Sequence, residues 1–154
     1  MTSPTNLDAA ASESRRVDQL IAHYGESHQN ASNELIHFIA IPLIMLSLIG
    51  MLFAIHPYVA YAFMAASMIY YVRLSMVFLV TMALWSVLSI AVVFAMGPNV
   101  LPISVAIFVG AWIMQFVGHK LEGKKPSFFE DIQYLWVGPL FVLSKLLEKL
   151  GIRW

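Results

Sequence analysis

The sequence predicts an all-α integral membrane protein, and two observations carry that prediction. Of its 154 residues, 60% are hydrophobic and only 12% are charged, whereas soluble domains are about half apolar and about a quarter charged. The apolar residues are also gathered into long runs, separated by short breaks that contain proline, glycine or a charge. Such runs are typical of helices that cross a bilayer.

The charge and cysteine content exclude several classes of function. Basic and acidic residues balance at nine each, without a basic block, so no nucleic-acid partner is expected. The absence of cysteine excludes disulfides, thiolate ligands and cysteine nucleophiles. The first apolar run starts only at Leu35, so this N-terminal region does not read as a secretory signal peptide, whose apolar core lies near the start.

The N-terminal region divides into a tail and a helix. Residues 1–12 are small and polar and are predicted to be disordered, which leaves residues 13–154 as a single membrane domain. From Glu13 onward the apolar residues follow the i, i+3, i+4, i+7 spacing of an amphipathic helix, here Val17, Leu20, Ile21 and Tyr24. This spacing predicts a helix lying along the membrane surface.

Four apolar stretches are predicted to be transmembrane helices, at about 35–55, 57–72, 74–96 and 100–118. A span needs roughly 17–25 residues, so the second is short for one. The last segment, 128–150, follows a capping box made by Ser127 and Glu130. Because it contains Gly138 and Pro139, we expect a re-entrant or interfacial helix there.

The distribution of positive charge predicts the orientation. Lysines and arginines occur near both termini, at Arg73 and in the 119–131 loop, whereas the loops at 56–57 and 97–99 carry none. The positive-inside bias therefore predicts that both termini are cytoplasmic. The membrane would be a bacterial inner membrane or the endoplasmic reticulum.

With four spans, this orientation brings three distant histidines, His28, His37 and His119, to one membrane face and leaves His56 at the other. On one unbroken helix, His28 and His37 would point to roughly opposite sides, so they can converge only if the chain breaks between them. The segment QNASNE supplies that break, with Ser32 as the expected N-cap. Asn33 and His37 then share one helix face.

A second polar cluster ends the fourth predicted span. Gln115, His119 and Glu122 follow i, i+4, i+7 spacing and form one stripe on an otherwise apolar helix. The adjacent Gly118 would let a neighbouring backbone come close. Imidazole and carboxylate groups together suit iron, zinc or manganese.

Each histidine by itself could simply be an amphipathic residue at a helix end. Three on one face, each beside Asn, Gln or Glu, favour a shared metal site. Around it, Tyr24, Asn33 and Gln115 are expected to support the ligands. Lys124 and Lys125 read either as topology anchors or as a site for an anionic headgroup.

Two stretches of the chain resemble a known family. They are YGESHQNASNELIHFIAIPL, with its Tyr-x-x-x-His-x-Asn opening and Asn-x-x-x-His, and QFVGHKLEGKKP, with Gln-Phe-x-Gly-His. Together they resemble the 2-hydroxy fatty acid dioxygenases, small membrane proteins like the yeast endoplasmic-reticulum enzyme of fatty-acid α-oxidation. The resemblance covers roughly residues 20–147.

The resemblance implies an iron(II)-dependent enzyme whose metal ligands are His28, His37 and His119. Many members have a longer spacing from the last histidine to the next acid, so Glu122 is only a candidate further ligand. The implied reaction converts a long-chain 2-hydroxy fatty acid and O2 into the acid one carbon shorter, CO2 and water, with membrane lipid around the acyl tail. Two alternatives stay open: a bis-histidine haem protein that carries electrons, and a metal-free membrane scaffold.

Overall fold

The protein is an assembly of helices throughout the part described by the structure, a computed structural model that covers residues 6–26, 28–123 and 134–154. Its elements are α1 (Asn6–Gly25), α2 (Ala31–Ile55), α3 (Pro57–Val72), α4 (Met76–Met96), the 3-10 turn η1 (Gly97–Asn99), α5 (Val100–Glu122) and α7 (Val137–Lys149). The predicted all-α class is confirmed. The four apolar stretches of the sequence correspond to α2, α3, α4 and α5.

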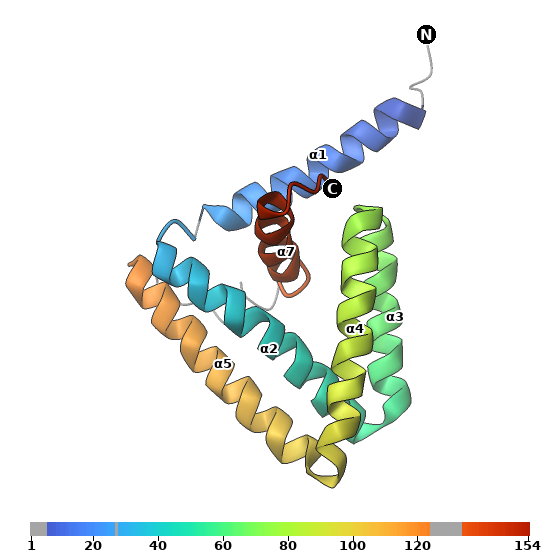
Figure 1. The fold of residues 1–154 in the computed structure, drawn as a ribbon, viewed down its shortest axis with the longest axis vertical. Coiled ribbons are helices and arrows are strands. Elements are labelled where there is room, and N and C mark those ends of the chain that lie inside the picture. The colour runs from blue at the N-terminus through green and yellow to red at the C-terminus, as the bar shows by residue number, and fades with distance from the viewer. Residues whose placement is uncertain (1–5, 27, 124–133) are drawn as a thin grey trace.

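The helices form two pairs that meet at one end. Figure 1 shows α2 beside α5 and α3 beside α4, joined at the bottom of the view by the α2–α3 turn and by η1. The far ends of the pairs diverge, and α7 lies between them beneath α1. The chain thus gathers the start of α2, the end of α5, α1 and α7 at the end opposite His56.

Helices α2 and α5 run antiparallel. They pack closely because a glycine lies at each end of their contact. A Cβ atom on Gly118 would collide with Asn33 and would lie 3.3 Å from Ile36. At the other end, a Cβ atom on Gly50 would collide with Ser104. The close approach expected at Gly118 is therefore present, and the neighbouring atoms belong to side chains of α2.

The largest apolar cluster joins α1, α2, α3, α4 and α7. Its buried members are Val17, Met45, Tyr71, Phe78, Met82, Leu140 and Leu147. Two hydrogen bonds attach the start of α7 to α3: Trp136 Nε1 donates to Ser67 Oγ over 2.9 Å, and the Tyr71 hydroxyl donates to the Trp136 carbonyl over 3.1 Å. This cluster holds α7 against the helices that frame the candidate site.

Two stretches, Ala31–Ile55 and Met76–Glu122, are long and apolar enough to cross a membrane, and the second comprises α4, η1 and α5. The helices α3, α4 and α5 expose large apolar side chains, among them Ile69, Val72, Val80, Leu84, Val87, Phe94, Val109 and Ile113. Extensive exposed apolar surface is typical of faces that contact lipid. The crossing of the membrane by all four helices stays a prediction.

The first helix begins at Asn6, earlier than the expected start at Glu13. The apolar periodicity begins only near Glu13, but Ala9, Ala10 and Ala11 are the strongest helix formers available. Propensity therefore extends the helix beyond its amphipathic part.

The second helix is capped by Asn30, so the prediction of Ser32 as N-cap is wrong. The Asn30 side chain accepts hydrogen bonds from the N–H groups of Ser32, over 2.9 Å, and Asn33, over 3.4 Å. The Asn30 N–H itself donates to Glu122, over 2.9 Å. That tertiary contact supports the earlier start, and it cannot be read from local propensity.

The last helix, α7, has 13 residues, too few to cross a bilayer. Pro139 occupies its first turn, where a missing N–H breaks no helical hydrogen bond. The predicted capping box at Ser127 and Glu130 lies outside the described residues.

Candidate metal centre

The three histidines singled out by the sequence come from three separate segments. His28 lies in the turn after α1, His37 in the second turn of α2 and His119 in the last turn of α5. The expected break between His28 and His37 is present, because α1 ends at Gly25 and α2 starts at Ala31. The antiparallel α2–α5 packing then brings His119 beside the other two.

The three imidazoles converge on one buried point. One ring nitrogen of each lies within 4.8 Å of those of the other two. The ring centroids are 4.2 Å apart for His28–His37, 5.2 Å for His37–His119 and 5.7 Å for His28–His119. All three side chains are at most 6% exposed, so water has little access to this cluster.

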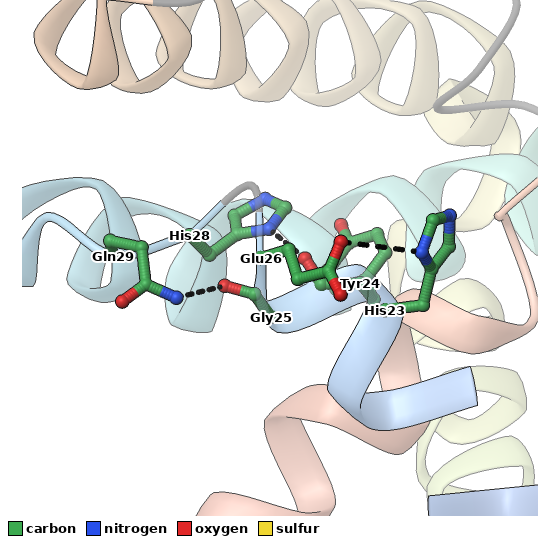
Figure 2. Close-up of polar contacts among 6 residues, drawn as sticks. All are labelled: His23, Tyr24, Gly25, Glu26, His28 and Gln29. Atoms are coloured by element: carbon green, nitrogen blue, oxygen red, sulfur yellow. Dashed lines mark hydrogen bonds and ion pairs between the residues drawn. The ribbon is translucent and has the colours of Figure 1, made fainter. Parts of the chain in front are cut away.

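Backbone carbonyls select the tautomer of two of the histidines. His28 Nδ1 lies 2.7 Å from the Tyr24 carbonyl oxygen, as Figure 2 shows, and His37 Nδ1 lies 2.9 Å from that of Asn33. A carbonyl oxygen only accepts, so each Nδ1 carries the hydrogen and Nε2 carries the lone pair of the neutral ring. Metal-binding histidines commonly have this arrangement, in which one nitrogen is held by the protein and the other is turned to the ion.

Two aromatic side chains pack against the His28 ring. The Tyr24 ring stacks on it at 4.3 Å with an interplanar angle of 16°. Phe141 of α7 lies 5.5 Å from His28 and 5.3 Å from Tyr24, measured between ring centroids. The sequence pattern gave no signal for Phe141, because its role depends on how α7 docks.

The Glu122 carboxylate binds backbone and side-chain N–H groups of the turn before α2. It accepts hydrogen bonds from Gln29 N–H at 2.8 Å, Asn30 N–H at 2.9 Å and Asn33 Nδ2 at 3.0 Å. The potential metal-binding group contains the three histidines and not Glu122. This carboxylate therefore ties the His28 turn and the start of α2 to the end of α5.

The chain has similarity to known proteins. The family described as Mpo1-like, 2-hydroxy-palmitic acid dioxygenase Mpo1-like, matches residues 14–150. The chain belongs to the Mpo1-like family. It is similar to the 2-hydroxy-palmitic acid dioxygenase MPO1 of Saccharomyces cerevisiae, with 29% identity over 138 residues that cover 85% of this chain and 79% of that protein. No solved structure matches it.

The structure describes two of the other polar residues that were expected near the histidines of this Mpo1-like chain. Asn33 and Gln115 are buried, at 0% and 3% exposure. Gln115 lines a small cavity together with Tyr24. Lys124 and Lys125 lie outside the described residues.

The two remaining histidines of the Mpo1-like chain stand apart from the cluster. His23 is exposed and forms an ion pair of 3.5 Å with Glu26, drawn in Figure 2. His56 is the N-cap of α3, where its ring accepts the Tyr58 N–H, and it lies at the opposite end of the helices. Neither contributes to the three-histidine group.

A polar opening of about 390 Å³ lies beside His28. Its lining includes Glu34 and Lys145, whose carboxylate and ammonium groups lie 3.7 Å apart. In the sequence, Lys145 is one of several positive charges near the C-terminus. The docking of α7 in this Mpo1-like fold brings it to the opening. The Lys145 ammonium group therefore lines the same opening as His28, one of the three histidines of the candidate metal centre.

Proposed function

We propose that this protein is an iron(II)-dependent dioxygenase that converts long-chain 2-hydroxy fatty acids to the acid one carbon shorter and CO2. The observation that carries the proposal is the convergence of three buried histidines, one ring nitrogen of each lying within 4.8 Å of those of the other two. The yeast relative bears the name of a 2-hydroxy-palmitic acid dioxygenase, which supports the same substrate class here.

The donor set fits a non-haem iron ion held by His28, His37 and His119. Neutral imidazoles bind iron(II), and a site with few protein ligands leaves coordination positions open, as in non-haem iron oxygenases. Iron(II), when bound, supplies the redox chemistry through which O2 reacts with the substrate. A bis-histidine haem uses two imidazoles, whereas three meet here with ring centroids 4.2 to 5.7 Å apart, which favours a metal ion bound directly by all three.

The reaction balances without an added cosubstrate. The 2-hydroxy acid and O2 yield the shortened acid, CO2 and water. Oxidation of the hydroxyl-bearing carbon to a carboxyl group releases three electrons, and oxidation of the original carboxyl carbon to CO2 releases one. These four electrons reduce both oxygen atoms of O2, so neither 2-oxoglutarate nor a flavin is required.

The residues of the chain orient the histidines and keep the site dry. The Tyr24 and Asn33 carbonyls hold the Nδ1 hydrogens of His28 and His37. Phe141 covers the His28 ring against water. We assign Glu122 to positioning of the His28 turn rather than to the metal, because its oxygens already accept three hydrogen bonds.

Cations are expected to attract the carboxylate of the substrate. Lys145 lines the polar opening at His28, and Lys124 and Lys125 are close in sequence to the end of α5. An ammonium group near the opening favours an anionic headgroup over a neutral lipid.

We further propose that residues 13–154 form one membrane domain. In it, α2, α3, α4 and α5 cross the bilayer, while α1 and α7 lie in the interface on the cytoplasmic side. This places the histidines where a headgroup at the membrane surface meets the protein. The acyl tail then extends among apolar helices.

Metal content and product analysis test the function together. His37→Ala and His119→Ala are each expected to lose most bound iron while the protein still inserts, and His23→Ala, which changes an exposed histidine of the same region, should keep it. Iron-loaded wild-type protein supplied with O2 and 2-hydroxypalmitate should form the shortened acid, detected by mass spectrometry.

Four results would contradict the proposal. Stoichiometric metal in both site variants would reject the shared site. An absence of shortened acid from folded, iron-loaded protein would reject the activity. Equal product from His119→Ala would assign the chemistry to free iron, and strict dependence on added 2-oxoglutarate would overturn the electron balance.

A further inference from the structure

An apolar cleft of about 270 Å³ lies between α2, α4 and α7. It is lined by Ile41, Pro42, Met45, Thr81, Met82, Leu84, Trp85, Leu88, Pro139, Val142 and Leu143. These lining residues include no charged side chain, and the Thr81 hydroxyl donates to the Val77 carbonyl of its own helix. The cleft therefore offers hydrocarbon contacts and has no feature that would recognise a headgroup.

The cleft shares lining residues with a second cavity, which reaches Tyr24, the residue whose ring stacks on His28. This second cavity has a volume of about 20 Å³, and its lining includes Tyr24 and Gln115. Three of its other lining residues, Ile41, Met45 and Pro139, also line the large cleft. On α2, Ile41 follows His37 by four residues, about 6 Å along the helix axis and on the same face.

The opposite side of the cleft is open. Leu84 and Leu88 line it from α4 and are 66% and 53% exposed. Both lie in a stretch apolar enough to cross a membrane. An alkyl chain can therefore enter sideways from the hydrocarbon phase without passing through water.

We propose that this cleft binds the alkyl tail of the 2-hydroxy fatty acid, with the acid group at the histidines and the tail running past Ile41 and Met45. The proposal rests on the proposed function for the identity of the head group. Its distinctive consequence is a lower limit on chain length without an upper one, because a tail longer than the cleft continues into the bilayer between Leu84 and Leu88.

Filling the cleft should flatten the dependence on chain length. Each buried methylene is worth about fourfold in affinity, so a Phe ring that displaces three of them lowers the preference by about 60-fold. We expect Thr81→Phe to reduce the kcat/KM ratio of 2-hydroxypalmitate over 2-hydroxyoctanoate by about this factor. Val80→Phe, on the exposed face of the same helix, should leave the ratio unchanged.

A second variant keeps the test valid if Thr81→Phe fails to fold. Leu143→Phe reaches the same cleft from α7 and should have the same effect, with Leu146→Phe, an exposed neighbour outside the lining, as its control. Bound iron should remain at the wild-type level in all four variants, because none of these residues lines the opening beside His28. An unchanged length preference in folded, iron-loaded Thr81→Phe and Leu143→Phe would overturn the cleft proposal.

Photo-crosslinking separates this proposal from the activity itself. A 2-hydroxy fatty acid with a diazirine at the tail end, bound in detergent-solubilised protein and irradiated, should label residues 81–88 and 139–143 whether or not turnover occurs. Labelling there without shortened acid from the wild type would support the cleft and reject the dioxygenase. Labelling elsewhere only, or labelling that phospholipid displaces as well as unlabelled 2-hydroxypalmitate does, would overturn the cleft proposal.

Discussion

Removal of the Glu122 carboxylate should weaken metal binding without removing a ligand. One of its oxygens accepts the Gln29 N–H, and the other accepts the Asn30 N–H and an Asn33 side-chain hydrogen. Glutamine at this position can offer an oxygen on one side only, so its amide hydrogens must face a donor on the other. Glu122→Gln therefore loses at least one hydrogen bond and adds a repulsive contact, and Glu122→Ala loses three.

The size of the effect follows from these contacts. Hydrogen bonds to a charged acceptor contribute about 1.5–3 kcal/mol each, and solvent screening at the partly exposed Glu122 reduces this to about 1 kcal/mol. Because about 1.4 kcal/mol corresponds to a factor of ten, we expect metal affinity to fall about 10-fold in Glu122→Gln and about 100-fold in Glu122→Ala. Loss of groups that support metal ligands typically costs about 10- to 100-fold.

The assay replaces iron with cobalt(II), whose visible spectrum reports its ligands. Affinity is measured by competition with a chelator, and hydrogen exchange follows the Gln29 and Asn30 amides. In Glu122→Gln the affinity and the amide protection should fall while the spectrum of the fully loaded site stays the same. The control is Glu148→Gln, which changes an exposed acid on α7.

Two outcomes would refute the reasoning. Wild-type affinity and amide protection in Glu122→Ala would show that the three hydrogen bonds do not hold the His28 turn. A changed cobalt spectrum with unchanged amide protection in Glu122→Gln would identify the carboxylate as a metal ligand.

Three further predictions concern packing, substrate binding and topology. Gly118→Ala should lower the free energy of unfolding by about 1–3 kcal/mol, the usual cost of overpacking, because the added Cβ meets Asn33. Gly110→Ala on the same helix, where a Cβ meets nothing within 4 Å, should leave the free energy of unfolding unchanged. Equal melting temperatures for the two variants would contradict the α2–α5 contact. Lys145→Gln should raise KM for 2-hydroxypalmitate about 2- to 5-fold, which corresponds to the free energy of a half-exposed ion pair. Glu34→Gln should lower KM, because it releases the lysine from its ion pair. Identical changes of KM in both variants would reject a role for Lys145 in carboxylate binding. Reporter fusions at the N- and C-termini should both report the cytoplasm, and opposite compartments would mean that the number of crossings is odd.

Much of the architecture follows from the sequence. Long apolar runs and their breaks predicted the four helices from α2 to α5, because helix formation in such runs satisfies the backbone locally and depends little on partners. The chain break between His28 and His37 was also predictable, since QNASNE is poor helix-interior sequence. The helix boundaries did not follow from the sequence: the N-cap of α2 is Asn30 rather than Ser32, and its N–H donates to a carboxylate 92 residues away.

The residue types of the candidate metal site, and their placement near helix ends, were determined by the sequence alone. Only the tertiary structure decided how they meet. The antiparallel contact at Gly118 brings His119 to His37, the docking of α7 adds Phe141 and Lys145, and Glu122 turns to the His28 loop. Each of these contacts joins segments far apart in the chain, and their geometry depends on side-chain packing between helices, which local periodicity does not encode.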